Sequence, residues 1–209
     1  MELVVRCSDA QKNELAAGAL PGLQVHYVTE VAAFARYPQA AACLDLLFEN
    51  DPSGAPLLRQ LRQPVILHSV SQTGAEAGGR WVRVNAWPGF LLHPVVEGSC
   101  PDPGVRQAAE AVWQQWGKTV AWLPDEPGFV TARVISSIIN EAYFALGEGV
   151  GTRAAIDTAM KLGTNYPFGP FEWAERIGRD NIVRLLQKLA IKDERYLPAP
   201  LLLEEMGIG

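Results

Sequence analysis

The chain has 209 residues, 48% of them hydrophobic, and a formal net charge of −5, which fits one or two globular domains. Its basic residues are scattered on an acidic background, which argues against a nucleic-acid-binding protein. No apolar run approaches the ~18 residues that cross a bilayer, and the N-terminus lacks the pattern of a signal peptide, so we expect a cytoplasmic protein that does not bind membranes.

Residues 1–124 alternate predicted strands with predicted helices. The predicted strands are short and apolar and span residues 3–5, 23–28, 43–48, 64–68, 81–84, 95–96 and 119–123. The predicted helices span residues 9–17, with Ser8 or Asp9 as the cap, then 30–35 (a helix or a turn), 56–61 and 105–117. This alternation predicts a mostly parallel α/β sheet.

After Pro124 the pattern changes, and no strand is predicted. Predicted helices cover residues 129–146, 153–162, 170–177 and 181–189. The first is apolar on more than one side, which indicates a helix that is buried or shared with a partner chain. We therefore expect two domains: a shortened Rossmann-like domain over residues 1–124 and an all-helical domain over residues 125–209.

The three cysteines are Cys7, Cys43 and Cys100. Their odd number and wide spacing argue against a disulfide framework and against a cysteine-based zinc site. We expect them to be free thiols or small apolar side chains, and we predict no metal site.

Three C-terminal stretches carry a family resemblance. Residues 125–130 read D-E-P-G-F-V, residues 157–172 contain D-x-A-M-x-x-G followed by P-x-G-P-F-E, and residues 195–202 read R-Y-L-P-A-P-L-L. Together they resemble the helical domain of L-3-hydroxyacyl-CoA dehydrogenases, a fold like the C-terminal domain of 6-phosphogluconate dehydrogenase. The glycines and prolines of these motifs shape helix reversals, so the motifs indicate the family without establishing activity.

The N-terminal half resembles the same family more weakly. Asp45 and Glu49 stand at the two acidic positions of the family's A-D-L-V-x-E-x-x-x-E segment. Residues 80–85 resemble the strand that carries the family's catalytic histidine, and Asn85 stands at the histidine position. Glu97, twelve residues later, matches the glutamate that pairs with that histidine, and Ser71 matches the active-site serine.

The resemblance implies NAD-dependent oxidation of a 3-hydroxyacyl-CoA in fatty acid metabolism, yet several parts of that machinery are missing. An amide such as that of Asn85 cannot take up a proton, and loss of a general base costs ~10²–10⁴-fold in rate. No glycine precedes Gly18, so the G-x-G-x-x-G dinucleotide loop is absent. Ala132 replaces the family's asparagine, and the chain stops short of the family's C-terminal tail.

We therefore expect a truncated, degenerate family member that needs no cofactor. Its candidate site residues are Glu97, Ser71 and Asn85. It would bind an acyl-CoA-like small molecule or form a homodimer through the helical domain, as the family does. The alternative is an active oxidoreductase that binds NAD and uses His68 or His93 as its base.

Glu97 fits a relic of a catalytic pair and a structural carboxylate equally well. Residues 3–5 could stand for the family's first strand or its second.

Overall fold

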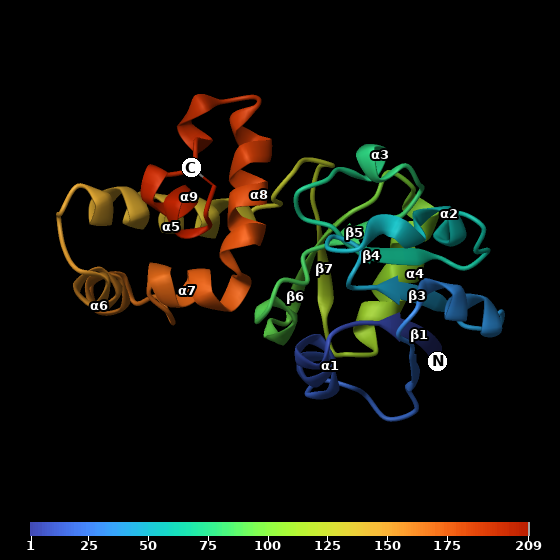
Figure 1. Cartoon of the computed structure of the whole chain (residues 1–209). Coiled ribbons are helices and arrows are strands. Elements are labelled where there is room, and N and C mark those ends of the chain that lie inside the picture. The colour runs from blue at the N-terminus through green and yellow to red at the C-terminus, as the bar shows by residue number, and fades with distance from the viewer. Residues whose placement is uncertain (209) are drawn as a thin grey trace. The chain divides into compact units, whose positions relative to one another are not determined.

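The computed structural model describes residues 1–208 and contains two compact units (Figure 1). The first spans Met1–Phe129, and the second begins at Val130. The first unit extends beyond Pro124 because Asp125 and Glu126 are hydrogen-bonded to side chains of the sheet, and Gly128 donates its N–H to the carbonyl of Val70.

The first unit is built on a seven-stranded sheet with the order β2-β1-β3-β4-β5-β6-β7. The strands are β1 (Glu2–Arg6), β2 (Gln24–Tyr27), β3 (Ala42–Asp45), β4 (Val65–His68), β5 (Val82–Val84), β6 (Val95–Ser99) and β7 (Thr119–Trp122). All neighbouring strands are parallel except β5 and β6. The predicted fold class, a Rossmann-like and mostly parallel sheet followed by a helical region, is confirmed.

The helices of this unit differ in places from the predicted ones. They are α1 (Asp9–Ala16), η1 (Val31–Arg36), η2 (Pro52–Gly54), α2 (Ala55–Leu58), α3 (Gly74–Ala77), η3 (Phe90–Leu92) and α4 (Pro103–Gln114). The predicted helix 105–117 starts earlier, at Pro103, because Asp102 caps it, and it ends before Trp116. Gly117 then reverses the chain with a φ of 66°. The predicted strand 43–48 ends at Asp45, and the predicted helix 56–61 is a single turn.

The strand order shows which family strand β1 represents. β1 lies between β2 and β3 and is parallel to both, so the chain leaves it on one side and returns on the other. In doubly wound sheets the first strand has this position, and ligands bind outside the carboxyl ends of the strands at this point. β1 therefore has the position of the first strand. We call the carboxyl ends of β1 and β3 the switch point.

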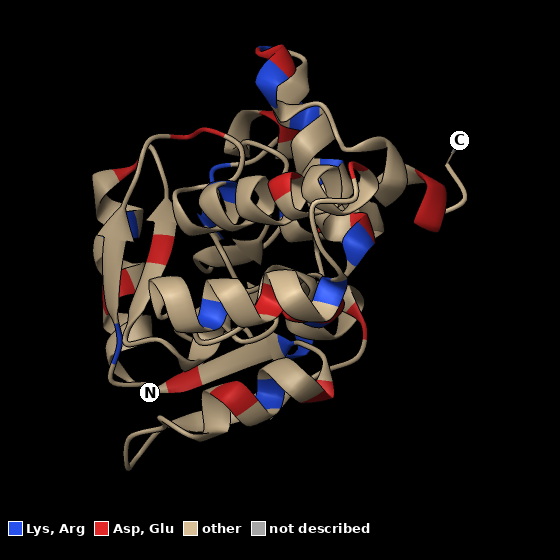
Figure 2. Cartoon of the chain, turned by 90° about the vertical axis from the view of Figure 1, so that its left-hand side faces the viewer, with Lys and Arg blue, Asp and Glu red and all other residues tan. Residues whose placement is uncertain are grey.

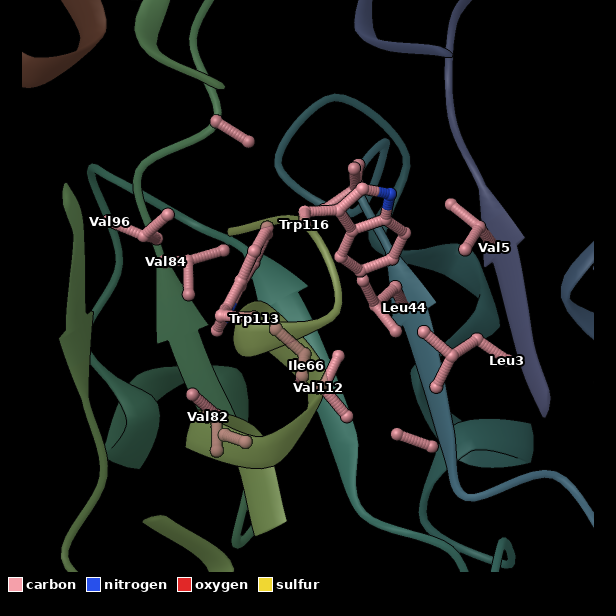
Figure 3. Packing of buried hydrophobic residues seen from close by; sticks show 14 of the residues in the cluster. Leu3, Val5, Leu44, Ile66, Val82, Val84, Val96, Val112, Trp113 and Trp116 are labelled. Carbon is pink, nitrogen blue, oxygen red and sulfur yellow. The ribbon is translucent and has the colours of Figure 1, made fainter. Parts of the chain in front are cut away.

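Both faces of the sheet are covered, which explains the continuous apolar runs of its central strands. On one face, Trp113 of α4 and Trp116, which follows α4, pack against side chains of β1, β3, β4 and β5 (Figure 3). On the other face, Val4 and Leu67 pack with Phe34 of η1.

The second unit is all-helical. Its elements are α5 (Thr131–Gly147), α6 (Arg153–Thr164), α7 (Pro170–Ile177), α8 (Arg179–Ala190), η4 (Glu194–Tyr196) and α9 (Pro200–Glu205). α5 packs against α7, α8 and α9. It begins two residues later than predicted, because Gly128 and Phe129 adopt left-handed φ values of 89° and 48°.

Three further expectations concern chemistry and the membrane. The three cysteines are free thiols. Residues 1–208 contain no group of three or more His, Cys, Asp or Glu side chains arranged to hold a metal ion. Within the same range, no helix combines the length and hydropathy that a membrane span requires. Figure 2 shows basic and acidic residues interspersed along the ribbon in that view.

Candidate functional site

The predicted site residues lie at the carboxyl ends of the parallel strands and on the neighbouring antiparallel strand. Ser71 follows β4, Asn85 follows β5, and Glu97 lies within β6. Because β6 runs antiparallel beside β5, it brings Glu97 opposite Asn85, although the two residues are twelve positions apart in the sequence. The sheet topology, rather than proximity in sequence, therefore brings Asn85 and Glu97 together.

Asn85 and Glu97 lie together, as the resemblance to the family's histidine–glutamate pair implies. The Asn85 N–H donates to the Glu97 carbonyl at 3.2 Å, and Asn85 Nδ2 lies 3.4 Å from Glu97 Oε2. Asn85 Oδ1 accepts the N–H of Trp87 at 3.2 Å, and the side chain is buried. Asn85 therefore keeps the pairing with the glutamate, but its amide has no basic atom.

Ser71 belongs to a second cluster, centred on Glu49. Glu49 Oε1 accepts the Ser71 hydroxyl at 2.6 Å and the Ser71 N–H at 2.7 Å, and Glu49 Oε2 accepts the Val70 N–H at 2.8 Å. The sequence identified Glu49 only as one of two family acids. Its role as the acceptor that holds the loop after β4 was not predicted.

His68 completes this cluster. Its Nε2 lies 3.5 Å from Glu49 Oε2, and its Nδ1 accepts the N–H of Ala86 at 3.1 Å. Since Nδ1 is an acceptor, the neutral ring carries its proton on Nε2, toward the carboxylate. The His68 side chain is 6% exposed. Both nitrogens are thus engaged, which fits a structural histidine better than the substitute base considered above.

His93, the other histidine proposed as a substitute base, lies at the end of η3. It is exposed, and its ring makes an edge contact with Phe90 at a centroid distance of 6.2 Å. Its carbonyl accepts a hydrogen bond from the Lys118 ammonium group at 2.9 Å. These contacts hold His93, within the β5–β6 connection, against Phe90 and Lys118.

Arg83 is a buried cation that the sequence pattern did not predict. Its side chain is fully buried, Nε donates to Asp125 Oδ1 at 2.8 Å, and the guanidinium lies over the Phe129 ring. It also donates to the carbonyls of Ser69, Gln72 and Glu126. Burial lowers the pKa of Arg83, and Asp125 opposes that shift. Arg83 thus joins the loop after β4 to the segment after β7.

A second buried ion pair lies at the switch point. Arg6, the last residue of β1, makes two hydrogen bonds to the carboxylate of Asp45, at 3.1 and 3.2 Å, and also binds Asp51. Asp45 is fully buried, and burial raises its pKa to about 6 although the Arg6 guanidinium opposes the shift. The pair joins the carboxyl ends of β1 and β3, and the contact of Arg6 with Asp51 adds the segment that follows β3.

The residues after β1 form the start of α1. Ser8 caps the helix through a reciprocal pair of hydrogen bonds with Gln11, and Asp9 lies in the first turn. Gln11 is 6% exposed, and its Nε2 donates to the carbonyls of Leu46 and Ala86, both at 3.0 Å.

Comparison with known proteins agrees with this geometry. The family model of the 3-hydroxyacyl-CoA dehydrogenase C-terminal domain matches residues 128–207. A probable 3-hydroxybutyryl-CoA dehydrogenase of Deinococcus radiodurans is 30% identical over 203 residues, covering 89% of this chain and 72% of the relative. The chain belongs to the 3-hydroxyacyl-CoA dehydrogenase family.

Other relatives of this 3-hydroxyacyl-CoA dehydrogenase-family chain are matched over shorter stretches. The 3-hydroxyadipyl-CoA dehydrogenase of Escherichia coli is 46% identical over 104 residues, which is 49% of this chain but 22% of that protein. The crystal structure of (S)-3-hydroxybutyryl-CoA dehydrogenase from Ralstonia eutropha superposes with a TM-score of 0.78 at 19% identity, covering 99% of this chain and 93% of that one, which shows the shared fold.

The family implies NAD, and the residues at the switch point do not fit it. A dinucleotide site needs glycines after the first strand, so that the pyrophosphate can approach the backbone at a helix N-terminus. Here Cys7, Ser8 and Asp9 follow β1, the helix cap is made by the chain's own side chains, and a carboxylate lies in the first turn. Asp9 would repel a pyrophosphate at this helix end.

Proposed function

We propose that this family member lacks NAD-dependent dehydrogenase activity and acts as a cytoplasmic, dimeric protein that binds an acyl-CoA-like ligand or a protein partner. The observation that carries the proposal is Asn85 in the place of the family's histidine, still paired with Glu97. Oxidation of a 3-hydroxyl group requires a base for the hydroxyl proton, and a carboxamide is not one at any useful pH.

A turnover assay tests this proposal. The protein is incubated with 3-hydroxybutyryl-CoA and NAD, and with acetoacetyl-CoA and NADH, while absorbance at the NADH band is followed. We expect no rate above that of a buffer control, and an active family member serves as the positive control. A protein-dependent rate that scales with enzyme concentration would refute the proposal.

The alternative is an active oxidoreductase with an altered site, and the cluster of His68, Glu49 and Ser71 favours it to some extent. An imidazole paired with a carboxylate beside a serine is an arrangement suited to proton transfer. This alternative requires NAD binding and predicts that His68→Gln abolishes any turnover while His93→Gln does not, or the reverse if His93 is the base. The hydrogen bond from Ala86 to His68 Nδ1 argues against it.

Two features of the helical unit support a homodimer. α6 is amphipathic, yet none of its 12 residues is buried within this chain. Ile156 and Met160 of α6 line a hollow of about 680 Å³ together with α5 residues such as Val134 and Ile138. An apolar surface of this kind on an otherwise packed domain marks an interaction site.

Light scattering tests the homodimer. We expect the mass of a dimer for the unmodified chain and of a monomer for Met160→Glu, because a carboxylate would be buried in the hollow. Lys188→Glu, on α8 outside the residues that line the hollow, is the control and should remain dimeric. A monomer for the unmodified chain at micromolar concentration would refute the homodimer.

Ligand binding is a separate question, to be tested by calorimetry with acetoacetyl-CoA. We expect a saturable signal without NAD, since Ser71 and Glu97 are retained. Absence of heat at millimolar ligand would restrict the proposal to the protein-interaction role.

A further inference from the structure

The switch point is the position at which doubly wound sheets bind their ligands, so its contents decide what this protein can bind there. We infer that helix α1 fills the switch point with its own side chains and locks the β5–β6 loop, residues 85–94, over it, so that no dinucleotide is accommodated. The inference concerns binding, whereas the proposed loss of turnover rests on Asn85.

Gln11 is the central residue of this arrangement. It lies in the first turn of α1, and its carboxamide reaches the carbonyl of Leu46, just after β3, and that of Ala86, just after β5. Its oxygen accepts the N–H of Ser8 at 3.0 Å. The buried amide thus has both its donor and acceptor groups engaged and spans the carboxyl ends of the strands.

Glu14, one turn further along α1, holds the β5–β6 loop. Its two carboxylate oxygens accept the N–H groups of Gly89 at 2.7 Å and Leu91 at 3.2 Å. Gly89 has a φ of 90°, a conformation that turns these N–H groups toward one acceptor and that other residues rarely adopt. The protein's own carboxylate therefore occupies a backbone anion site on this loop.

Lys118 and the Arg6–Asp45 pair complete the enclosure. The Lys118 ammonium group donates to the carbonyls of Leu91 and His93, which fixes the far end of the loop. Arg6 and Asp45 place a buried ion pair at the adjacent carboxyl ends of β1 and β3. A dinucleotide would have to displace several satisfied buried groups, and each group left without a partner is costly.

The first experiment is titration of the unmodified chain with NAD and with NADH, by calorimetry and by NADH fluorescence. We expect no saturable binding up to millimolar cofactor. Saturable binding at one site per chain would overturn the inference. If that binding occurred without turnover, the proposed loss of activity would stand, so the two failures can be told apart.

The second experiment tests the lock itself by amide hydrogen exchange. Glu14→Ala should raise the exchange rates of Gly89 and Leu91 at least tenfold, whereas Asn13→Ala, an exposed neighbour on the same helix, should leave them unchanged. Gln11→Ala should raise exchange in the same loop. Unchanged rates in Glu14→Ala, with the fold intact by circular dichroism, would overturn the lock.

Discussion

Asp45 and Arg6 form a buried ion pair at the carboxyl ends of β1 and β3. The pKa of Asp45 is raised to about 6, above the ~3.9 of an unfolded chain, so the folded protein binds more protons between these values. The contribution of Asp45 to the free energy of unfolding therefore falls as the pH rises from about 4 to about 6. Arg6 limits that loss by pairing with the charged form.

Replacement of Arg6 by methionine tests this balance. Removing one partner of a buried ion pair costs about 3–5 kcal/mol, because the remaining charge is uncompensated. We expect Arg6→Met to lower the free energy of unfolding in urea by this amount at pH 7.5 and by less at pH 5, where Asp45 can take up a proton. An equal loss at both pH values would contradict the assignment. Arg6→Met combined with Asp45→Leu should recover most of the stability.

At this scale the family resemblance placed Asn85 opposite Glu97, and the two side chains do lie together, whereas the assignment of Ser71 as a site residue stays a prediction. The sequence did not predict Arg83 or Gln11. In a strand pattern, an arginine between two valines indicates an exposed face, and a glutamine in a first helical turn indicates solvent. Both are buried because backbone carbonyls from distant loops accept their hydrogen bonds, and periodicity carries no information about those loops.

Among the elements, α5 has a stripe that suits pairing with a second copy. Arg133, Ser137 and Glu141 follow one another at intervals of four residues and all line the hollow. Antiparallel pairing of two α5 helices about a two-fold axis at Ser137 would place Arg133 beside Glu141 of the partner subunit, and the symmetry repeats this pair.

Charge exchange tests this register. We expect Arg133→Glu and Glu141→Arg each to weaken the dimer by about tenfold, a difference of about 1.4 kcal/mol, because each places like charges together. The double variant should restore the dissociation constant, as measured by sedimentation. Arg184→Glu on α8 is the control. If the loss of dimerisation free energy in the double variant equals the sum of the losses in the two single variants, this register is rejected. That result would not reject a dimer.

Elements with a clear apolar pattern were predicted well, and short helices without one were missed. Helix α5 and strands β1 and β4 follow clear apolar patterns, whereas α3 and α9 are one or two turns long and were missed. Leu46 and Phe48 follow β3 and are also buried. The apolar run in the sequence is therefore longer than the strand that is hydrogen-bonded to its neighbours. Hydrophobic pattern reports burial, and the end of a strand depends on pairing that the pattern does not contain.

Over the whole chain, the fold class follows from sequence, while the strand order does not. Alternating elements predicted a parallel sheet, but only the structure shows that β1 separates β2 from β3. Connections between parallel strands are long, and the residues of a strand do not determine on which side of it the next strand lies.

This topology also bears on the speed of folding. In the first unit, β1 pairs with β3 across a wide sequence separation, and β3 pairs with β4 after another crossover. In the second unit, α6 contacts α7 and α7 contacts α8, which are neighbours in the chain, while α5 packs against the more distant α7, α8 and α9. Non-local pairing is slow to form and local helix packing is fast. Helices α6, α7 and α8, although made after the sheet unit on the ribosome, should therefore pack together before the sheet closes around Trp113 and Trp116.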